Sequence, residues 1–265
     1  PAHLSDEERT EKADKVSFRI AEILSRTAFS FFPNEYISIH RKLFQGIYKH
    51  AEKIRDYNIT KKEYKEFYMP KNKPEIVTVP KANYIAVRGK GDPNEEDGAY
   101  QQAISVLYAV AYTLKMSYKT DYKIEGFFEY VVPPLEGFWW QENTAGVDYT
   151  DKALFNWISV IRLPDFITKE NFKWTVETAT KKKKLDCSLA EFMTIDEGLC
   201  IQIMHLGAFD DEPATVALMD TYLEQSGYVN DMNKVSLHHE IYLSDPRKVA
   251  PEKYKTVIRH PIKKI

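Results

Sequence analysis

The chain has 265 residues, of which 43% are hydrophobic and 29% charged, and its formal net charge is -2. This composition is ordinary for a globular protein, and the charge excludes a global preference for nucleic acid or an anionic membrane. The two cysteines, Cys187 and Cys200, are too few for a zinc cluster and fit a reducing compartment, so we expect a cytoplasmic protein. Because no apolar run reaches the roughly 18 residues of a membrane span, we expect no membrane contact.

Two amphipathic helices are predicted at the N-terminus. The first begins at a capping box of Ser5 and Glu8 and continues to Phe31, and the second carries an apolar stripe from Ile39 to Ile54. Two narrow apolar faces do not enclose a core by themselves. We therefore expect residues 1–60 to form a helical appendage used for docking or dimerisation, and a homodimer is one arrangement that would result.

Part of this appendage has a family resemblance. Residues 12–63, and the stretch from Ile39 to Ile59 in particular, resemble the front of a Fic/DOC domain. In that family a later His-Pro-Phe-x-x-Gly-Asn loop supplies the catalytic base and cradles phosphates. The only His-Pro pair of this chain is His260–Pro261, which Ile262 follows. A nucleotidyl-transfer activity is therefore rejected, and a helical appendage remains.

Residues 61–265 are expected to form an α+β domain. Helices are predicted from near residue 97, from 168 and from 213, and strands at 75–88, 122–132, 155–163, 189–195, 199–206, 236–244 and 254–260. A dinucleotide-binding loop after Gly89 is rejected, because Asn94 stands where its third glycine is required. The order of elements indicates a β-α-β-β unit repeated twice, with a cleft where the two units meet.

An aromatic corner is predicted at the end of the strand at 122–132. Pro133 and Pro134 end a strand because they supply no N–H, and Gly137 allows a turn before Phe138. Trp139 and Trp140 follow directly. Since neighbouring side chains of an extended segment point to opposite faces, at least one indole is expected to line a ligand pocket or contact a partner. A corner that fills the core is the alternative.

A polar strand is predicted near the C-terminus. Alternation places His238, Glu240, Tyr242 and Ser244 on an open face, and the apolar set His239, Ile241 and Leu243 on a face packed under helices. A solvated edge strand is one alternative reading. A metal site on His238 and Glu240 is another, but it lacks a clear third ligand. No metal and no cofactor are therefore predicted.

Four stretches, in the same order, resemble a GyrI-like small-molecule-binding domain, and the resemblance runs from about residue 62 to the C-terminus. It implies a duplicated β-α-β-β fold of the SHS2 type, with a cleft between the repeats, aromatic walls and a central glutamate. The family also resembles the effector-binding domains of AraC- and MerR-type regulators. The stretches are 66–74, 134–140, 212–215 and 238–247.

The Leu-Glu-Gly-x-Trp-Trp and His-His-Glu-Ile-Tyr motifs resemble stand-alone members that hydrolyse cyclopropane-bearing DNA-alkylating compounds. This likeness implies a detoxifying hydrolase that binds flat aromatic or cationic molecules. The alternative is a non-catalytic module that sequesters drugs or serves a transcription regulator. No DNA-binding helix-turn-helix precedes the domain, so no direct nucleic-acid contact is expected. The candidate catalytic residues are Glu240 and Tyr242, and the candidate ligand-binding residues are Trp139, Trp140, Glu136, Tyr108, Tyr112 and His238.

Overall fold

The structure, a computed structural model, describes residues 64–142, 148, 150–233 and 236–265, together with Thr10, Asp14, Lys15, Ser17 and Phe18. Those five residues are helical, and the rest of the two predicted N-terminal helices lies outside the described residues. The chain forms two compact units, residues 1–57 with 125–129, and residues 58–124 with 130–265. The second unit carries the sheet and the site. None of the described helices combines the length and the apolar character needed to cross a membrane.

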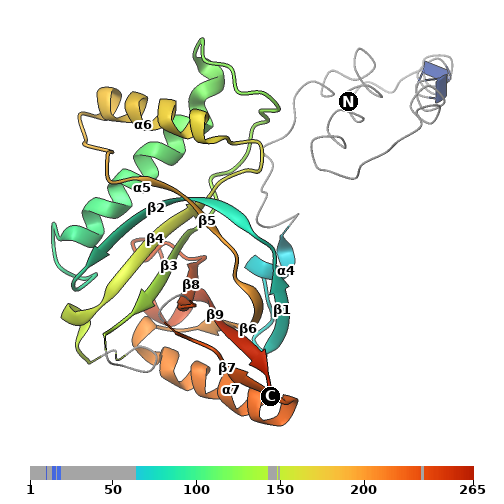
Figure 1. The fold of residues 1–265 in the computed structure, drawn as a ribbon, viewed down its shortest axis with the longest axis vertical. Coiled ribbons are helices and arrows are strands. Elements are labelled where there is room, and N and C mark those ends of the chain that lie inside the picture. Colours follow the sequence, from blue (N-terminus) through green and yellow to red (C-terminus); the bar gives the residue numbers. More distant parts are fainter. Residues whose placement is uncertain are drawn as a thin grey trace. The chain divides into compact units, whose positions relative to one another are not determined.

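Nine strands form one antiparallel sheet in the second unit (Figure 1). They are β1 (Glu75–Val79), β2 (Ala82–Lys90), β3 (Leu135–Trp140), β4 (Asn156–Arg162), β5 (Glu191–Ile195), β6 (Gly198–Leu206), β7 (Tyr228–Asn230), β8 (His238–Tyr242) and β9 (Lys255–Lys264). Their spatial order is β1-β6-β9-β8-β3-β4-β2-β5, and the short β7 pairs with β9. β3 and β8 are therefore neighbours at the middle of the sheet.

Four helices accompany the sheet: α4 (Lys65–Tyr68), α5 (Ala99–Lys115), α6 (Lys169–Lys183) and α7 (Glu212–Ser226). Thr168 caps α6, because its hydroxyl accepts the Asn171 N–H and the Asn171 side chain accepts the Thr168 N–H. Pro213 lies in the first turn of α7, where its missing N–H costs nothing.

The duplication expected from the sequence is present in the topology. β2-α5-β3-β4 and β6-α7-β8-β9 follow one another with the same internal strand order, since β4 lies between β2 and β3 and β9 lies between β6 and β8. The strand before each unit pairs with the opposite unit: β1 pairs with β6, and β5 pairs with β2. This exchange, β7 and the four-residue α4 were not predicted from the sequence.

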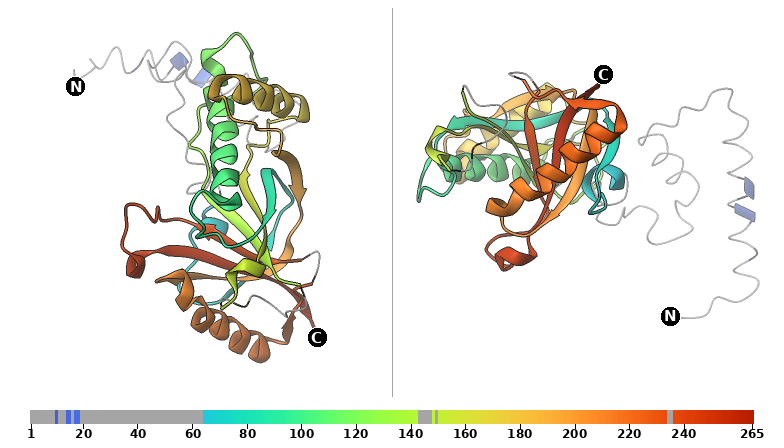
Figure 2. Two further views of the ribbon diagram at one scale, coloured as in Figure 1. Left: turned by 90° about the vertical axis from the view of Figure 1, so that its left-hand side faces the viewer. Right: turned by 90° about the horizontal axis from the view of Figure 1, so that it is seen from below.

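The two long helices α5 and α7 lie against the same face of the sheet, towards opposite ends (Figure 2). Tyr100 of α5 packs on Trp139, and Met219 of α7 packs with Ile258, which is the register partner of Glu240. The sequence analysis placed the helices on the face of His239 instead. That face is covered by α4, whose Phe67 and Tyr68 pack with Ile241.

Two local predictions around the aromatic corner are wrong. The predicted strand at 122–132 does not form, and β3 begins only at Leu135, after Pro133 and Pro134, since prolines cannot donate to a strand ladder. Gly137 is not at a turn but inside β3. A Cβ there would lie 2.6 Å from Trp139 Nε1 and 2.9 Å from the Tyr242 hydroxyl, so the missing side chain lets these two groups meet. The extended stretch predicted at 75–88 forms two separate strands, β1 and β2. The other predicted strands and helices of this unit are confirmed, with ends that differ by a few residues.

Candidate functional site

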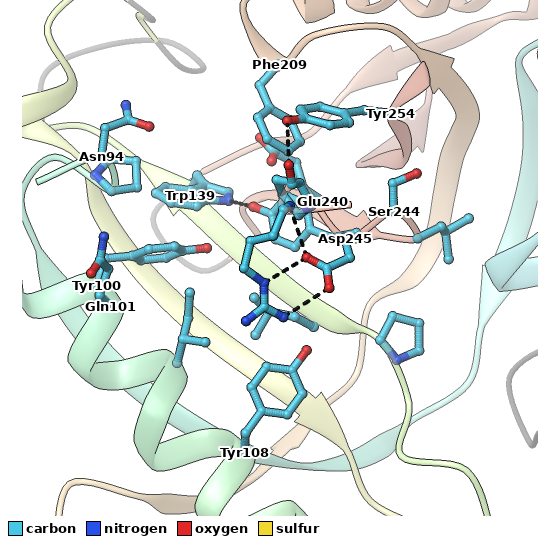
Figure 3. Close-up of a pocket in the computed structure, with 18 of the residues that line it drawn as sticks. Asn94, Tyr100, Gln101, Tyr108, Trp139, Phe209, Glu240, Ser244, Asp245 and Tyr254 are labelled. Atoms are coloured by element: carbon cyan, nitrogen blue, oxygen red, sulfur yellow. Dashed lines mark hydrogen bonds and ion pairs between the residues drawn. The ribbon is translucent and has the colours of Figure 1, made fainter. Parts of the chain in front are cut away.

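A cavity of about 950 Å³ opens on the face of the sheet that α5 and α7 cover (Figure 3). Its wall is formed by α5, β3, β8 and the turns that precede α7 and β9. Most of the large side chains that line it are aromatic. They are Tyr68, Tyr100, Tyr108, Trp139, Phe155, Phe209, Tyr242 and Tyr254.

Trp139 is the aromatic residue at the centre of one wall. Its ring centroid lies 5.3 Å from that of Tyr100 and 5.5 Å from that of Phe155. Its Nε1–H donates to the Tyr242 hydroxyl over 2.9 Å. Ring packing and this hydrogen bond fix the indole in one orientation, so its exposed part offers a rigid apolar surface.

The opposite wall is carried by the turn that leads from β6 into α7. Gly207 has a φ of 142°, which favours glycine, and His205 hydrogen-bonds through its two ring nitrogens to Thr215 and to the carbonyl of Ala208. The turn therefore holds Phe209 in place. The centroid of the Phe209 ring lies 5.7 Å from that of Tyr242, and the two rings are nearly perpendicular. The Tyr254 ring, which precedes β9, lies 5.2 Å from the Phe209 ring and is tilted against it.

Glu240 is the buried carboxylate of this cavity, with only 7% of its surface exposed. His238 approaches it from the sheet, with Nε2 2.9 Å from Oε1. Tyr242 shares a strand face with Glu240, and burial, followed by the Glu240 charge, raises the pKa of Tyr242 well above its ordinary value. Tyr242 therefore stays protonated and acts as a donor. The His238 ring therefore contacts the carboxylate directly, and a protonated tyrosine is its neighbour on the same strand face.

The other charged groups of the lining are paired. Asp245 makes a bidentate ion pair with Arg247 at 2.9 and 3.0 Å, which holds the pKa of the Asp245 carboxyl well below its ordinary value. Lys152 contacts Asp210 at 2.7 Å. In the described part of the chain no lysine or arginine forms an ion pair with Glu240. The negative charge of Glu240 is therefore balanced by neutral donors and by what enters the cavity.

The structure brings together four of the candidate site residues, Glu240, Tyr242, Trp139 and Tyr108, and Figure 3 shows the last of these reaching from α5 towards the cavity. His238 lies behind Glu240 rather than on the lining. Tyr112, half exposed, is one helical turn from Tyr108 and does not line the cavity.

Two further candidates lie on the other face of the sheet. Trp140 packs in the cluster around Phe138 and Val160, and Glu136 is fully buried beside His239. The alternation of β3 explains why Trp139 faces the cavity and its neighbours do not. Sequence reasoning missed Tyr100, Phe155, Phe209 and Tyr254, for which the chain carries no local signal, because they approach from helices and turns.

The sequence analysis found no third ligand to join His238 and Glu240 in a metal site, and the structure places Glu212 beside them. It is fully buried, and one ligand atom each of Glu212, His238 and Glu240 lies within 4.8 Å of the others. Ligands of a tetrahedral zinc, at about 2.0–2.1 Å from the ion, lie about 3.3 Å apart. The separation of 2.9 Å between His238 and Glu240 is that of a direct hydrogen bond. The geometry favours a hydrogen-bonded pair over a coordinated ion.

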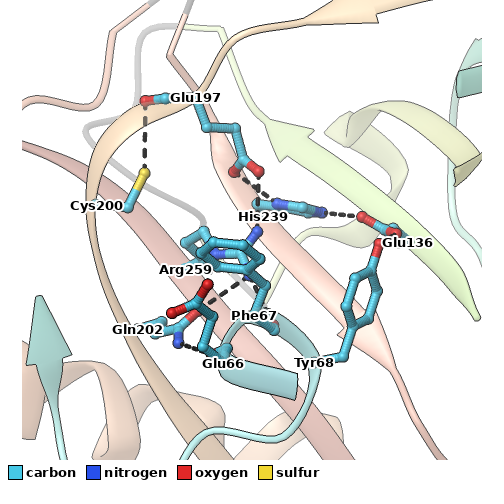
Figure 4. Close-up of polar contacts among 9 residues, drawn as sticks. All are labelled: Glu66, Phe67, Tyr68, Glu136, Glu197, Cys200, Gln202, His239 and Arg259. Atoms are coloured by element: carbon cyan, nitrogen blue, oxygen red, sulfur yellow. Dashed lines mark hydrogen bonds and ion pairs between the residues drawn. The ribbon is translucent and has the colours of Figure 1, made fainter. Parts of the chain in front are cut away.

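A second polar cluster, the His239 network, fills the opposite face (Figure 4). The His239 ring contacts Glu136 through Nε2 at 3.0 Å and Glu197 through Nδ1 at 2.7 Å. Arg259 donates to Glu197, to Gln202 and to the carbonyl of Phe67 in α4. The Tyr68 hydroxyl donates to the remaining oxygen of Glu136 at 2.6 Å.

Charge explains why this cluster holds together. Burial acts to lower the pKa of His239, but Glu197 and Glu136 outweigh it, and the net effect is a raised pKa. The charges of His239 and Arg259 lower the pKa of Glu197 to about 2 against the opposing effect of burial. His239 is therefore an imidazolium between two carboxylates, and each charge is buried only because the others are present.

Removing the hydroxyl of Tyr68 should destabilise the fold. In Tyr68→Phe, one oxygen of the buried Glu136 loses its donor, and we expect the free energy of unfolding to fall by about 1–3 kcal/mol. Chemical denaturation measures this. The control is Tyr64→Phe, because its exposed hydroxyl reaches Asp165 only at 3.5 Å, and a change within about 0.5 kcal/mol is expected. Equal effects of the two variants would contradict the network.

Stability should also depend on pH through His239. A raised pKa gives stability that is complete below the unfolded-state pKa of about 6.5 and is lost as pH rises through the folded-state pKa. The lowered pKa of Glu197 gives stability above about pH 4.5 that is lost on further acidification. We expect the advantage of the wild type over His239→Gln, about 3–5 kcal/mol, to be largest near pH 5–6 and to shrink above it, in urea unfolding at each pH.

His260 provides the matched control, because burial holds its pKa well below the ordinary value. A lowered histidine pKa gives a pH dependence of stability of the opposite sign, since on acidification the unfolded chain binds a proton that the folded chain does not bind. The advantage of the wild type over His260→Gln should therefore shrink as pH falls below about 6.5. Parallel pH profiles for the two variants would contradict the assignment of an imidazolium to His239.

Comparisons with known proteins match this architecture. The family model of the GyrI-like small molecule binding domain matches residues 72–263. An uncharacterized conserved protein from Listeria innocua is 47% identical, with a TM-score of 0.72, over 77% of this chain and 98% of its own. A hydrolase from the same organism is 46% identical, with a TM-score of 0.73, over 79% of this chain and 100% of its own.

A search of curated proteins found no match. The comparisons give no support to the resemblance of residues 12–63 to a Fic/DOC domain, since the family model begins at residue 72. The sequence match, the two solved structures that cover most of the chain, and the duplicated fold agree with one another. The chain belongs to the GyrI-like family of small-molecule-binding domains.

Proposed function

We propose that the cavity binds flat aromatic or cationic small molecules and that residues 61–265 contain the whole binding site. One observation carries this proposal: a single buried carboxylate, Glu240, among aromatic walls in a cavity of about 950 Å³. Aromatic faces favour planar ligands and cations, and a volume of roughly 300–1,000 Å³ suits a drug-sized molecule. Both cysteines are free and buried, which is consistent with a cytoplasmic role.

We further propose that the site hydrolyses cyclopropane-bearing electrophiles, as a detoxification. Glu240 takes a proton from water, the water oxygen forms a bond to a cyclopropane carbon, and one carbon–carbon bond of the ring breaks. The electron pair of the broken carbon–carbon bond moves into the conjugated system of the substrate. The Tyr242 hydroxyl donates a hydrogen bond to the negative charge that develops, and Glu240 then returns the proton. The net reaction adds one water across the broken bond.

The geometry supports these roles in two ways. The Tyr242 oxygen accepts the Trp139 N–H, so the indole fixes the hydroxyl on the strand face that Glu240 shares. Glu240 combines burial with a place on the cavity lining, which brings its carboxylate within reach of a bound water and a bound ligand. The hydrolase from Listeria innocua is a relative at 46% identity.

A non-catalytic module that sequesters drugs or serves a transcription regulator is the second candidate. The absence of a lysine or arginine partner for Glu240 among the described residues favours it, because an unbalanced buried carboxylate attracts cations. Such a module would bind one equivalent of ligand and leave it unchanged, so turnover separates the two functions.

Adjacent tryptophans should respond differently to a ligand. Binding of a planar aromatic probe such as proflavine should quench the fluorescence of Trp139, which lines the cavity, so Trp139→Phe should lose most of the quenching. Trp139→Ala should weaken binding by about 1–3 kcal/mol. Trp140→Phe is the matched control, because Trp140 packs on the other face. Quenching lost in Trp140→Phe but kept in Trp139→Phe would contradict this cavity.

Glu240→Gln keeps the shape of the side chain and removes its basicity. With a cyclopropane-bearing substrate in excess and product mass followed over time, we expect turnover to fall by roughly 10²–10⁴-fold. Affinity for a neutral planar ligand should change little. Glu224→Gln, which changes a carboxylate of α7 that does not line the cavity, is the control and should keep its turnover.

The same assay has two opposing outcomes. Equal rates of the wild type and Glu240→Gln would remove Glu240 from the mechanism. A wild type that yields no product with several such substrates, but whose affinity for cations falls in Glu240→Gln, would establish the binding module instead.

A further inference from the structure

A chain of side chains runs from Glu240 into the sheet, away from the cavity. His238 Nε2 contacts Glu240 Oε1 at 2.9 Å, and His238 Nδ1 contacts His260 Nε2 at 2.7 Å. His260 Nδ1 contacts the amide nitrogen of Asn230 at 3.4 Å. Both histidines are buried, with 3% and 1% exposure. The mechanism proposed above uses only the first member of this chain.

The direction of every hydrogen bond in this chain follows from its far end. The backbone N–H of Met232 donates to Asn230 Oδ1 at 2.9 Å, which turns the Asn230 NH₂ group towards His260. An NH₂ group can only donate, so His260 Nδ1 accepts. A ring nitrogen that accepts a hydrogen bond carries no hydrogen, so the hydrogen of the His260 ring is on Nε2.

The same logic carries to His238. Because His260 Nε2–H donates, His238 Nδ1 accepts, and His238 carries its hydrogen on Nε2, where it donates to Glu240. A second hydrogen on His238 would have to enter at Nδ1, against the hydrogen that His260 already directs there. His238 therefore offers Glu240 a neutral N–H rather than the positive charge of an ion pair.

We propose that Asn230 and His260 are positioning residues that keep His238 a neutral donor, so that Glu240 remains basic enough to activate water. This inference rests on the proposed hydrolase function of Glu240. An imidazolium at position 238 would stabilise the Glu240 carboxylate and make it a weaker base. The adjacent His239 shows the alternative state, since it has carboxylates on both sides and is charged.

The groups around the His238–Glu240 pair come from three elements. Tyr242 lies on the same strand as the pair, His260 lies on β9, and Glu212 begins α7. The two carboxylates, Glu212 and Glu240, favour a second proton on His238, and the hydrogen donated by His260 opposes it. Whether His238 Nδ1 carries a hydrogen therefore depends on His260, and His260 is the residue to substitute.

His260→Gln is the first test. A glutamine amide presents either a donor or an acceptor to His238 Nδ1, so it no longer excludes a second hydrogen there. We expect ¹⁵N–¹H spectra of the histidine side chains, recorded across pH, to show hydrogen on His238 Nε2 alone in the wild type. In His260→Gln, His238 should take up a second hydrogen near neutral pH.

Kinetics give the second readout. With a cyclopropane-bearing substrate, kcat of His260→Gln should fall by roughly 10- to 100-fold at pH 6, the range usual for residues that orient a catalytic group. KM should change by less than about threefold, because His260 does not line the cavity. The loss should be recovered as pH rises and His238 releases its second hydrogen. A purely structural defect would instead lower kcat equally at every pH.

Asn230→Leu gives an independent variant in case His260→Gln fails to fold. It removes the donor that orients His260 and should cause a smaller change in the same direction. The matched control is Asn233→Leu, because the Asn233 amide lies in the same loop and donates to the carbonyl of Asp231 rather than to a histidine. That variant should keep the pH profile of the wild type.

The outcomes separate the two proposals. Hydrogen on both His238 nitrogens in the wild type, or an unchanged pH profile in a folded His260→Gln, overturns the positioning role. A wild type without turnover refutes the hydrolase, while the spectra, recorded without substrate, still decide where the hydrogens lie. Zn²⁺ added to the wild type should leave the His238 signals in place, and their displacement by stoichiometric zinc would overturn the proposal in favour of a metal site.

Discussion

His239 lies between two buried carboxylates, and its contacts join parts of the chain that are far apart in sequence. Glu136 comes from β3, Glu197 from the turn between β5 and β6, and Arg259 from β9. Leaving any one of these charges without its partners would cost several kcal/mol, because the cluster is almost free of solvent. The cluster therefore specifies one register for the central strands, and through the Phe67 carbonyl it also fixes α4 against the sheet.

The register that this cluster specifies also positions the cavity residues, because β3 and β8 are neighbours. Once Glu136 is opposite Ile241, Gly137 is opposite Glu240 and Trp139 is opposite His238. A slip of one residue between β3 and β8 would place Trp139 and Glu240 on opposite faces of the sheet. The adjacent residues His238 and His239 thus have separate tasks. One supports the carboxylate that faces the ligand, and the other carries a structural charge on the reverse of the sheet.

Alternation along the strands was enough to predict much of this site. It placed Glu240 and Tyr242 on one face, and it required one of the adjacent indoles to differ from the other, as Trp139 and Trp140 do. It could not say which face the long helices cover, since both faces of β8 are almost entirely buried. Gly137 was misread as a turn because its role, a close approach of Trp139 to Tyr242, depends on a strand 103 residues away.

Other features lay beyond any local pattern. The exchange of β1 and β5 between the two halves is a tertiary pairing, and the local sequence of neither strand predicts which strand it pairs with. Glu212 and His260 approach His238 from a helix and from another strand, so their proximity appears only in the folded chain. The prolines before β3 were predicted to end a strand, but the strand lies after them rather than before.

The distribution of the cavity residues separates chemistry from ligand choice. Glu240, Tyr242 and Trp139 stand on central strands whose register the charged cluster fixes, so their mutual geometry is rigid. Tyr108, Phe209 and Tyr254 reach the same space from a helix and from turns, which can differ in sequence without disturbing a strand ladder. The two halves contribute opposite walls because β3 and β8 meet at the middle of the sheet. A change in the helix or the turns would therefore alter which ligand fits, while the carboxylate, its tyrosine and its histidine support would keep the same arrangement.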